Sequence, residues 1–368
     1  MTQTDLLQVV SLFDISGQPE EVKPLGEGLI NDTYLVVTKG AENPDYVLQR
    51  INNHVFPDVD MVMRNIDIVT THIRKKLAKE GVSDIRRHVL TFIALKNHPN
   101  KLYAEFCGNY WRMMIYVDHA LTKEEVNADS SRAAGETFGR FQAMLADVPY
   151  ELGETIKDFH NMEYRLEQLR QTAKEDVAGR LNEPEVQALL ENIGRHTEEM
   201  TAAERLYREG KLPKRVCHCD TKVNNMLFSE DGKEVLCVID LDTVMPSFIF
   251  SDYGDFLRSA ANAKAEDEAD LSKIKLRMDV VRAFTEGYLS SARSFLTPLE
   301  IEMLPFAVKL FPYMQSVRFL WDYLNGDKYW KVKYTKHNLV RAQNQFRLFE
   351  KVMEAEPELV SYIKTQLQ

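Results

Sequence analysis

A short polar loop between two apolar strands constrains this chain more than any other feature. The segment His218–Asn225 reads His-Cys-Asp-Thr-Lys-Val-Asn-Asn, and the apolar run Val235–Ile239 follows it and ends at Asp240. Phosphoryl transfer needs few protein groups: a carboxylate beside the accepting hydroxyl, and ligands for the magnesium ion that neutralises the phosphates. Asp220 fits the first role, as general base or orienting carboxylate, and Asn225 and Asp240 fit the second. The spacing therefore predicts a kinase site on a loop between two short strands.

Other polar residues near this loop have predicted supporting roles. We expect His218 to hold the loop by hydrogen bonding rather than to take part in the chemistry. Asp242 is either a metal or substrate ligand or a cap for the next turn. Ser251–Arg258 begins a helix with two carboxylates in its first turn. Asp252 there either caps the helix, where a negative charge is favourable, or braces the catalytic loop.

The bulk properties of the chain exclude several classes of protein. With 368 residues it is too long for one small core, and 44% hydrophobic and 10% aromatic residues are globular values. The net charge of −10 argues against a general nucleic-acid binder. The amino terminus lacks a signal-peptide pattern, and no stretch approaches the roughly 20 apolar residues of a membrane span. We therefore expect a cytoplasmic monomer or homodimer that binds neither nucleic acid nor membrane.

The order of strand and helix patterns divides the chain into two parts. Strand patterns with one long helix fill the first part, where we expect a short helix over 5–13, a strand–glycine turn–strand unit over 24–37, strands at Tyr46–Ile51, Val89–Leu95, Lys101–Glu105 and Trp111–Val117, and a helix over Met61–Glu80. Helical patterns dominate later, at about 130–147, 159–178, 184–209, 252–262, 266–294, 298–325 and 336–366. This order predicts an α+β, bilobal protein-kinase-like fold. A nucleotide-binding lobe would span 1–117, and a larger, mainly helical catalytic and substrate-binding lobe would span 118–368.

The first lobe carries candidate nucleotide contacts. A glycine turn with Gly26 and Gly28 stands where a kinase places its phosphate-covering loop, although an ordinary hairpin is the alternative. On the third strand, Gln49 and Arg50 occupy the place where a Val-Ala-Ile-Lys strand has its lysine. Arg50 is the candidate for the phosphates because a guanidinium grips oxygens through two donors, with a solvent-facing arginine as the alternative.

The last strand of this lobe leads into the crossing to the second lobe. Backbone groups near Tyr116 and Val117 would meet the edge of adenine there, between apolar side chains. An aromatic and methionine-rich run is equally typical of any buried strand. Its place in the order of elements favours the adenine interpretation.

A late aromatic segment, Gln315–Trp330, is the candidate acceptor site. It places Arg318 and Asp322 on one helix, followed by Tyr329 just after a glycine. Aromatic rings suit the apolar faces of a sugar, and charged groups can bond its hydroxyls. The alternative is a helix that packs its aromatic residues in the core of the second lobe.

These segments resemble the aminoglycoside phosphotransferase and choline kinase superfamily of small-molecule kinases. Ile239–Asp242 in place of Asp-Phe-Gly distinguishes them from protein kinases. Within the superfamily the chain is most similar to the N-acetylhexosamine 1-kinases, through Gly28–Tyr34, Tyr46–Asn52 with Val55–Pro57, and Arg318–Tyr329. That resemblance implies ATP and Mg²⁺ as cofactors and the anomeric hydroxyl of GlcNAc or GalNAc as acceptor, giving the sugar 1-phosphate. It also implies the roles stated above for Asp220, Asn225 and Asp240, and it makes Arg318 and Tyr329 sugar-site candidates.

Two alternatives remain open at this point. One keeps the fold and changes the acceptor to choline, homoserine or an aminoglycoside. The other is a nucleotide-binding protein with a degenerate site, because the strand lysine is missing and no glutamate precedes Glu80 in the long helix. The sequence leaves open the sugar, its configuration at C4, the nucleotide preference and the residue that replaces the lysine.

Overall fold

The computed structural model describes residues 2–26, 30–123 and 127–367, which form two compact units. The first, which we call the sheet unit, comprises Met1–Thr122, Asp147–Lys157 and Met226–Met245. The second, the helical unit, comprises Lys123–Ala146, Asp158–Asn225 and Pro246–Gln368. A functional division at residue 117, as the sequence predicts, stays a prediction.

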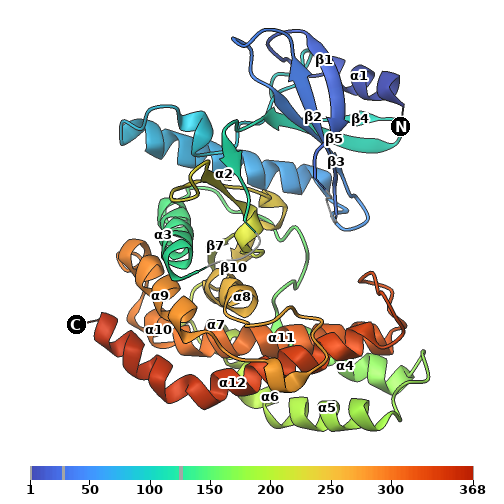
Figure 1. The fold of residues 1–368 in the computed structure, drawn as a ribbon, viewed down its shortest axis with the longest axis vertical. Coiled ribbons are helices and arrows are strands. Elements are labelled where there is room, and N and C mark those ends of the chain that lie inside the picture. The colour runs from blue at the N-terminus through green and yellow to red at the C-terminus, as the bar shows by residue number, and fades with distance from the viewer. Residues whose placement is uncertain (1, 27–29, 124–126, 368) are drawn as a thin grey trace. The chain divides into compact units, whose positions relative to one another are not determined.

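An antiparallel five-stranded sheet forms the centre of the sheet unit (Figure 1). The strand order is β1-β2-β3-β5-β4, with β1 at Pro19–Pro24, β2 at Asp32–Thr38, β3 at Tyr46–Ile51, β4 at Tyr103–Phe106 and β5 at Asn109–Ile115. Helix α1 (Gln3–Ser11) packs its Val9 and Val10 into the same apolar cluster as Leu48 and Trp111. The strand at Tyr46–Ile51 is confirmed. Two strands flank the predicted glycine turn, but β1 ends at Pro24, where the predicted unit begins, and residues 27–29 lie outside the described residues. The long helix is α2 (Val59–Lys79), capped by Asp58 through the amide of Met61 at 2.9 Å.

One predicted strand is wrong as a regular element. Val89–Leu95 is an extended segment that makes only isolated bridges, including Phe92 with Met114. The reason lies in the edge that it meets: β4 already pairs with residues 109–112 of β5. Only the end of β5 remains, where the amide of Ile93 donates to the Met113 carbonyl at 2.8 Å.

The sheet unit contains a second sheet of three strands, two of which follow the polar loop in sequence. It contains β6 (Ala120–Leu121), β8 (Met226–Ser229) and β9 (Val235–Val238) in the order β6-β8-β9. We expected two strands around the loop, and β7 (Arg215–Cys217) and β9 are those strands. The sequence did not predict β8. This strand has only four residues, too few to show a clear alternation of apolar and polar side chains.

Helices make up most of the helical unit (Figure 1). They are α3 (Ala128–Leu145), α4 (Met162–Glu175), α5 (Pro184–Arg195), α6 (Thr197–Met200), α7 (Ala202–Arg208), α8 (Phe250–Ala260), α9 (Met278–Ala292), α10 (Pro298–Glu302), α11 (Leu304–Leu324) and α12 (His337–Gln366). Most of α11 is buried, and α12 packs along it. Strand β7 pairs with β10 (Met245–Ser247) just before α8 begins.

Three predicted helices are interrupted. The helix expected over 184–209 is three helices, which break at His196 and Thr201. The helix expected over 266–294 begins only at Met278, because Asp270 caps a short 3₁₀ turn instead. The helix expected over 298–325 divides at Met303, and a proline stands in the first turn of each half, where its missing N–H is harmless.

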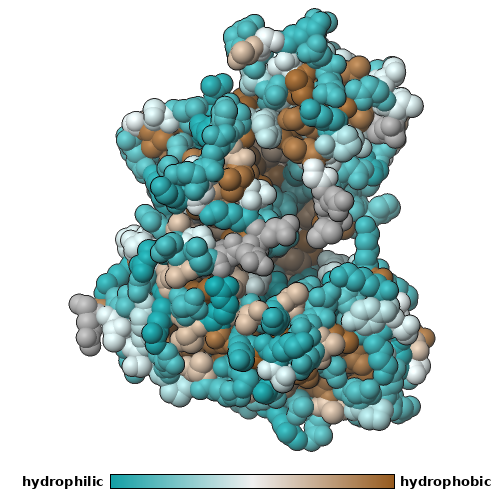
Figure 2. Space-filling view, viewed as in Figure 1, coloured by the Kyte–Doolittle hydropathy of each residue, from teal (hydrophilic) through white to brown (hydrophobic). Residues whose placement is uncertain are grey.

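The described residues contain no helix that is both long and apolar enough to cross a membrane. On the face shown in Figure 2, hydrophilic side chains predominate, and apolar side chains are scattered among them.

Candidate active site

The polar loop after β7 brings Asp220 and Asn225 together. A 3₁₀ turn at Val223–Asn225 closes the loop, and the amide of Asn225 donates to the Lys222 carbonyl at 3.0 Å. The Asn225 Nδ2 donates to the main-chain oxygen of Asp220 at 2.8 Å and to its Oδ2 at 3.1 Å. Lys222 Nζ lies 2.9 Å from the same Oδ2. Because Nδ2 serves Asp220, the Oδ1 of Asn225 is the atom that can ligate a cation.

Asp252, at the start of α8, holds this loop in shape. Its two carboxylate oxygens accept from the amides of His218 at 3.0 Å and Cys219 at 2.8 Å, and Gln142 Nε2 donates to it at 2.8 Å. The Thr221 hydroxyl donates to the main-chain oxygen of Asp252 at 2.7 Å. Burial raises the pKa of Asp252, and these hydrogen bonds oppose the shift. Its contacts are those of the loop-bracing alternative, although it also stands in the first turn of a helix.

His218 is buried inside the helical unit. Its Nδ1 accepts from the amide of Asp220 at 3.3 Å, a contact that holds the main chain at this carboxylate. The rings of Phe138 and Phe141 lie 6.0 and 6.1 Å from the imidazole, centroid to centroid. These contacts suit a supporting role for His218.

The sheet unit carries the other two predicted carboxylates, in the turn after β9. Asp240 is exposed and has a left-handed backbone conformation, with φ 60° and ψ 58°. Asp242 is buried, and its two oxygens are held by Asn31 Nδ2, at 2.7 Å, and by the Arg112 guanidinium. Asp240 is therefore accessible to a ligand, whereas Asp242 anchors the turn.

The glycine turn and the third strand show where the nucleotide candidates lie. Gly26 has a left-handed φ of 69°, which suits glycine, and Gly28 lies outside the described residues. The Arg50 guanidinium pairs with Asp32 and donates to the Asn109 side chain at 3.1 Å, and the Arg50 side chain is 43% exposed. These contacts occupy Arg50 with protein groups on the surface of the sheet.

The candidate adenine contacts follow β5. The amide of Tyr116 donates to the Asp45 carbonyl at 2.9 Å, so the carbonyl of Tyr116 is the group that can meet a ligand. Tyr116 and Val117 line a pocket of about 480 Å³ together with the turn between β2 and β3.

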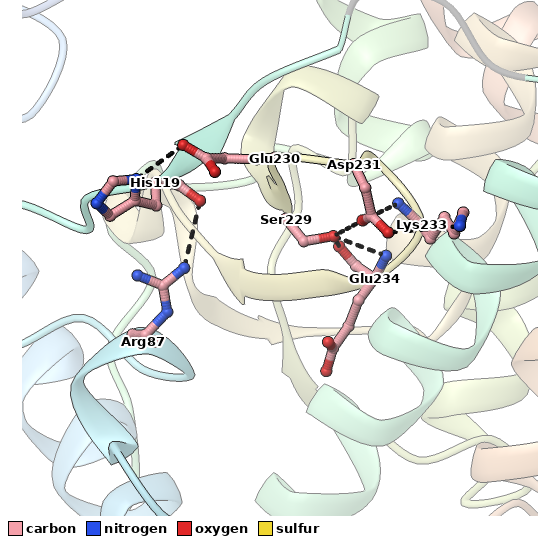
Figure 3. Close-up of a pocket in the computed structure, with 7 residues that line it drawn as sticks. All are labelled: Arg87, His119, Ser229, Glu230, Asp231, Lys233 and Glu234. Atoms are coloured by element: carbon pink, nitrogen blue, oxygen red, sulfur yellow. Dashed lines mark hydrogen bonds and ion pairs between the residues drawn. The ribbon is translucent and has the colours of Figure 1, made fainter.

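A second pocket, shown in Figure 3, lies over the β8–β9 turn. Its charged groups largely pair with one another, such as His119 with Glu230 at 2.7 Å.

Arg318, one of the residues predicted to bind the acceptor substrate, lies in the helical unit near Arg165 and two aromatic rings. The Arg318 guanidinium carbon lies 5.0 Å from the Phe159 ring centroid and 5.3 Å from that of Trp330. Arg165 donates to the Phe159 carbonyl through two nitrogens, at 3.1 and 2.9 Å. Burial lowers the pKa of Arg165 to about 10 and also lowers that of Arg318. Among the described residues, neither guanidinium has an ion-pair partner.

A buried histidine, His160, lies close to these arginines, and their charges affect its pKa. His160 Nδ1 lies 3.0 Å from the Ser251 hydroxyl. Burial, and then the charges of Arg318, Arg165 and Arg258, hold the pKa of His160 well below its usual value. Arg258 differs from the other two arginines because it pairs with Asp255 at 2.9 Å. The positive charges of Arg318, Arg165 and Arg258 therefore add to the effect of burial on His160.

Asp322 lies inside the loop that carries the aromatic residues. Its Oδ1 accepts from the amides of Lys328 at 3.0 Å and Tyr329 at 2.8 Å. Its Oδ2 accepts from the amide of Trp330 at 3.0 Å and from Asn338 Nδ2 at 2.9 Å. Both carboxylate oxygens of Asp322 therefore accept hydrogen bonds from protein groups, whereas Tyr329 is about 50% exposed.

Comparison with known proteins gives one family and a common fold. The model of the phosphotransferase enzyme family matches residues 21–288. An aminoglycoside phosphotransferase from Alicyclobacillus acidocaldarius is 13% identical, with a TM-score of 0.62 over 98% of this chain and 96% of that one. An amicoumacin kinase in complex with AMP-PNP and Ca²⁺ is 15% identical, with a TM-score of 0.60 over 95% and 94%. A choline kinase from Cryptosporidium parvum is 14% identical, with a TM-score of 0.56 over 95% of each chain.

These similarities confirm the fold predicted from the sequence, a kinase-like fold with a small antiparallel sheet lobe and a larger helical lobe. At such low identity they carry information on the fold alone. Residues that sequence reasoning missed are Arg112, Gln142 and Arg165. The only available signal for Arg112 was the cross-strand register, in which it faces Gln49.

Proposed function

The chain belongs to the phosphotransferase enzyme family, and we propose that it phosphorylates the anomeric hydroxyl of an N-acetylhexosamine with ATP. The products are the sugar 1-phosphate and ADP. The observation that carries the acceptor class is the Arg318 guanidinium, which lies over the rings of Phe159 and Trp330 and has no ion-pair partner among the described residues.

In the proposed reaction, Asp220 orients the acceptor hydroxyl and takes its proton. The hydroxyl oxygen forms the new bond to the γ-phosphorus while the bond from that phosphorus to the bridging oxygen of ADP breaks. The anomeric hydroxyl is more acidic than an ordinary alcohol, so a carboxylate is a sufficient base. Lys222, 2.9 Å from Asp220, is placed to balance negative charge on that side chain.

The donor atoms at the predicted metal residues fit magnesium. Asn225 Oδ1 and the exposed carboxylate of Asp240 are hard oxygen ligands, the kind that Mg²⁺ prefers. The described residues contain no cluster of three or more acidic, histidine or cysteine side chains that would enclose a cation. That is compatible with Mg²⁺, which usually binds through one or two carboxylates and the phosphates of its substrate. Bound there, the ion would neutralise phosphate charge.

For the nucleotide we propose contacts in the sheet unit. The turn with Gly26 and Gly28 would cover the phosphates, and backbone groups of Tyr116 and Val117 would meet adenine. The similar amicoumacin kinase structure contains AMP-PNP, which supports an adenine nucleotide here.

For the acceptor, the charge of the helical unit favours a neutral sugar over an amine. Choline and aminoglycosides are cations, and the guanidinium groups of Arg165 and Arg318, which have no ion-pair partner among the described residues, would repel them. A sugar ring can stack its apolar face on an aromatic side chain, and a guanidinium can donate to an acetamido carbonyl. Tyr329 remains a candidate contact, and we propose that Asp322 supports it by bracing the loop.

The test measures ATP-dependent product formation with Mg²⁺ over GlcNAc, GalNAc, glucose, galactose, choline and an aminoglycoside, followed by phosphorus NMR. We expect a phosphate on C1 of an N-acetylhexosamine. Asp220→Asn should lower kcat by about 10²- to 10⁴-fold, the usual contribution of a general base, and leave ADP binding intact. Turnover on a different acceptor would refute the sugar assignment. Nucleotide binding without turnover on any acceptor would favour the degenerate-site alternative.

A further inference from the structure

The third strand has no lysine at the place where a kinase uses one to bind the nucleotide phosphates. A buried arginine, Arg112, lies beside that place. Gln49 on β3 is the cross-strand partner of Arg112 on β5. Directly paired residues in a sheet have side chains on the same face, and Arg112 Nε donates to Gln49 Oε1 at 3.0 Å. Arg112 therefore reaches the place where a lysine at position 49 would lie.

Arg112 is joined to the turn that carries the predicted metal ligand. It forms an ion pair with Asp242, two residues after Asp240, and each side chain of the pair is only 2% exposed. Buried charges are costly unless they are paired and hydrogen-bonded, so each partner fixes the other. Helix α2 also holds this turn, because Asn65 Nδ2 donates to the Val244 carbonyl at 2.9 Å.

The Arg112–Asp242 pair also contacts Asn31, which follows the glycine turn. Asn31 Nδ2 donates to the second oxygen of Asp242 at 2.7 Å, and Asn31 Oδ1 accepts from the amide of Asn52 at 2.9 Å. Gln49 Nε2 donates to the Thr33 hydroxyl at 3.1 Å. One network therefore connects β2, β3, β5 and the turn after β9, all within the sheet unit.

Arg50, the candidate from the sequence, lies on the opposite face of β3. Adjacent residues of a strand point to opposite faces, and Arg50 is the neighbour of Gln49. Its guanidinium is occupied by Asp32 and Asn109. Arg112 uses Nε for Gln49 and Nη1 for Asp242, and its Nη2 has no hydrogen-bond partner among the described residues.

We propose that Arg112 replaces the missing strand lysine. It holds the turn of Asp240 through Asp242 and donates from Nη2 to a phosphate oxygen of the nucleotide. This inference rests on the proposed function only in requiring a bound nucleoside triphosphate, and it is independent of the acceptor. An arginine suits both tasks because its rigid fork can serve a carboxylate and a phosphate at once.

The experiment measures binding of ADP and AMP-PNP with Mg²⁺ by calorimetry, together with urea unfolding. Arg112→Met leaves the buried carboxylate of Asp242 without its counter-charge. The informative variant is therefore Arg112→Gln combined with Asp242→Asn, which removes both charges and keeps polar groups. We expect this double variant to recover stability relative to Arg112→Met. It should still bind nucleotide about 10- to 100-fold more weakly than the wild type, the effect of one lost charge-assisted hydrogen bond.

Two further variants make the result decisive. Arg64→Met removes an exposed arginine of α2 in the sheet unit, whose guanidinium donates to the Glu151 carbonyl at 3.3 Å, and serves as the matched control. Arg50→Met tests the rival cation. Wild-type nucleotide affinity in the stable double variant would overturn the proposal, as would a large loss in Arg50→Met alone. Because the readout is nucleotide binding, a wrong acceptor assignment leaves this test unaffected.

Discussion

At the scale of single residues, carboxylates divide into those that hold the chain and those that face a ligand. Asp242, Asp252 and Asp322 are buried, and side-chain amide, guanidinium or main-chain donors occupy their oxygens. Asp220 is partly accessible and Asp240 is exposed. A carboxylate saturated with hydrogen bonds is a poor ligand or base, so the accessible pair is the one to which we assign chemistry.

Asp322→Asn tests the bracing role at this scale. An asparagine can accept on only one oxygen, so it cannot satisfy all the amides of Lys328, Tyr329 and Trp330. We expect a loss of about 1–3 kcal/mol in unfolding free energy, and a larger rise in acceptor KM than fall in kcat. The control is Asp279→Asn, an exposed carboxylate on α9. An unchanged acceptor KM with unchanged stability would contradict the role.

The catalytic loop could be predicted from sequence because its information is local. Asp220 and Asn225 lie five residues apart, and one loop brings them together. Arg112 and Asp242 lie 130 residues apart, and their pairing depends on the register of β3 with β5. No local pattern encodes that register, so the sequence points to Arg50 and not to Arg112.

At the scale of elements, close contact between α3 and α9 depends on glycine. A Cβ built at Gly287 would lie 2.0 Å from the Arg132 carbonyl oxygen, and one at Gly135 would lie 2.2 Å from that of Phe284. Neither backbone oxygen can move without displacing its own helix. Helical periodicity predicted both helices from the sequence, but it carries no information on how closely two helices approach.

Gly287→Ala should therefore destabilise the protein. We expect a loss of about 1–3 kcal/mol or more in unfolding free energy, the cost of overpacking a well-packed contact. The matched control is Gly194→Ala in α5, where an added Cβ meets nothing within 4 Å. That variant should gain about 0.5–1 kcal/mol, because alanine is the better helix former. Urea unfolding of both variants checks the pair, and equal effects would disprove the close-packing argument.

At the scale of the whole molecule, stability is a property of two units that need not unfold together. A chain with two compact units need not follow a two-state transition, so a change should be assigned to the unit that contains it. In the helical unit, Glu204 of α7 accepts from the amide of Met162, the first residue of α4, at 2.6 Å. Its other oxygen is buried and has no hydrogen-bond partner among the residues that the structure describes.

Burial raises the pKa of Glu204 from its usual value of 4.5 to about 7. Because the folded-state pKa is the higher one, Glu204 contributes stability that is fully present below pH 4.5 and is lost as the pH rises through 7. The size of this contribution is about 3 kcal/mol. Glu204→Gln keeps an acceptor for Met162 and cannot ionise, so its unfolding free energy should lack this decline.

Urea unfolding from pH 4.5 to 8, followed by a probe in the helical unit, measures the difference between wild type and Glu204→Gln. That difference should change by about 3 kcal/mol across the range, with the variant gaining relative to the wild type as the pH rises. Glu198→Gln, at an exposed position nearby, should follow the wild type throughout. Parallel curves for wild type and Glu204→Gln would show that Glu204 ionises normally. The buried oxygen would then have to be reached by water, because an unsolvated carboxylate at that position could not keep its usual pKa.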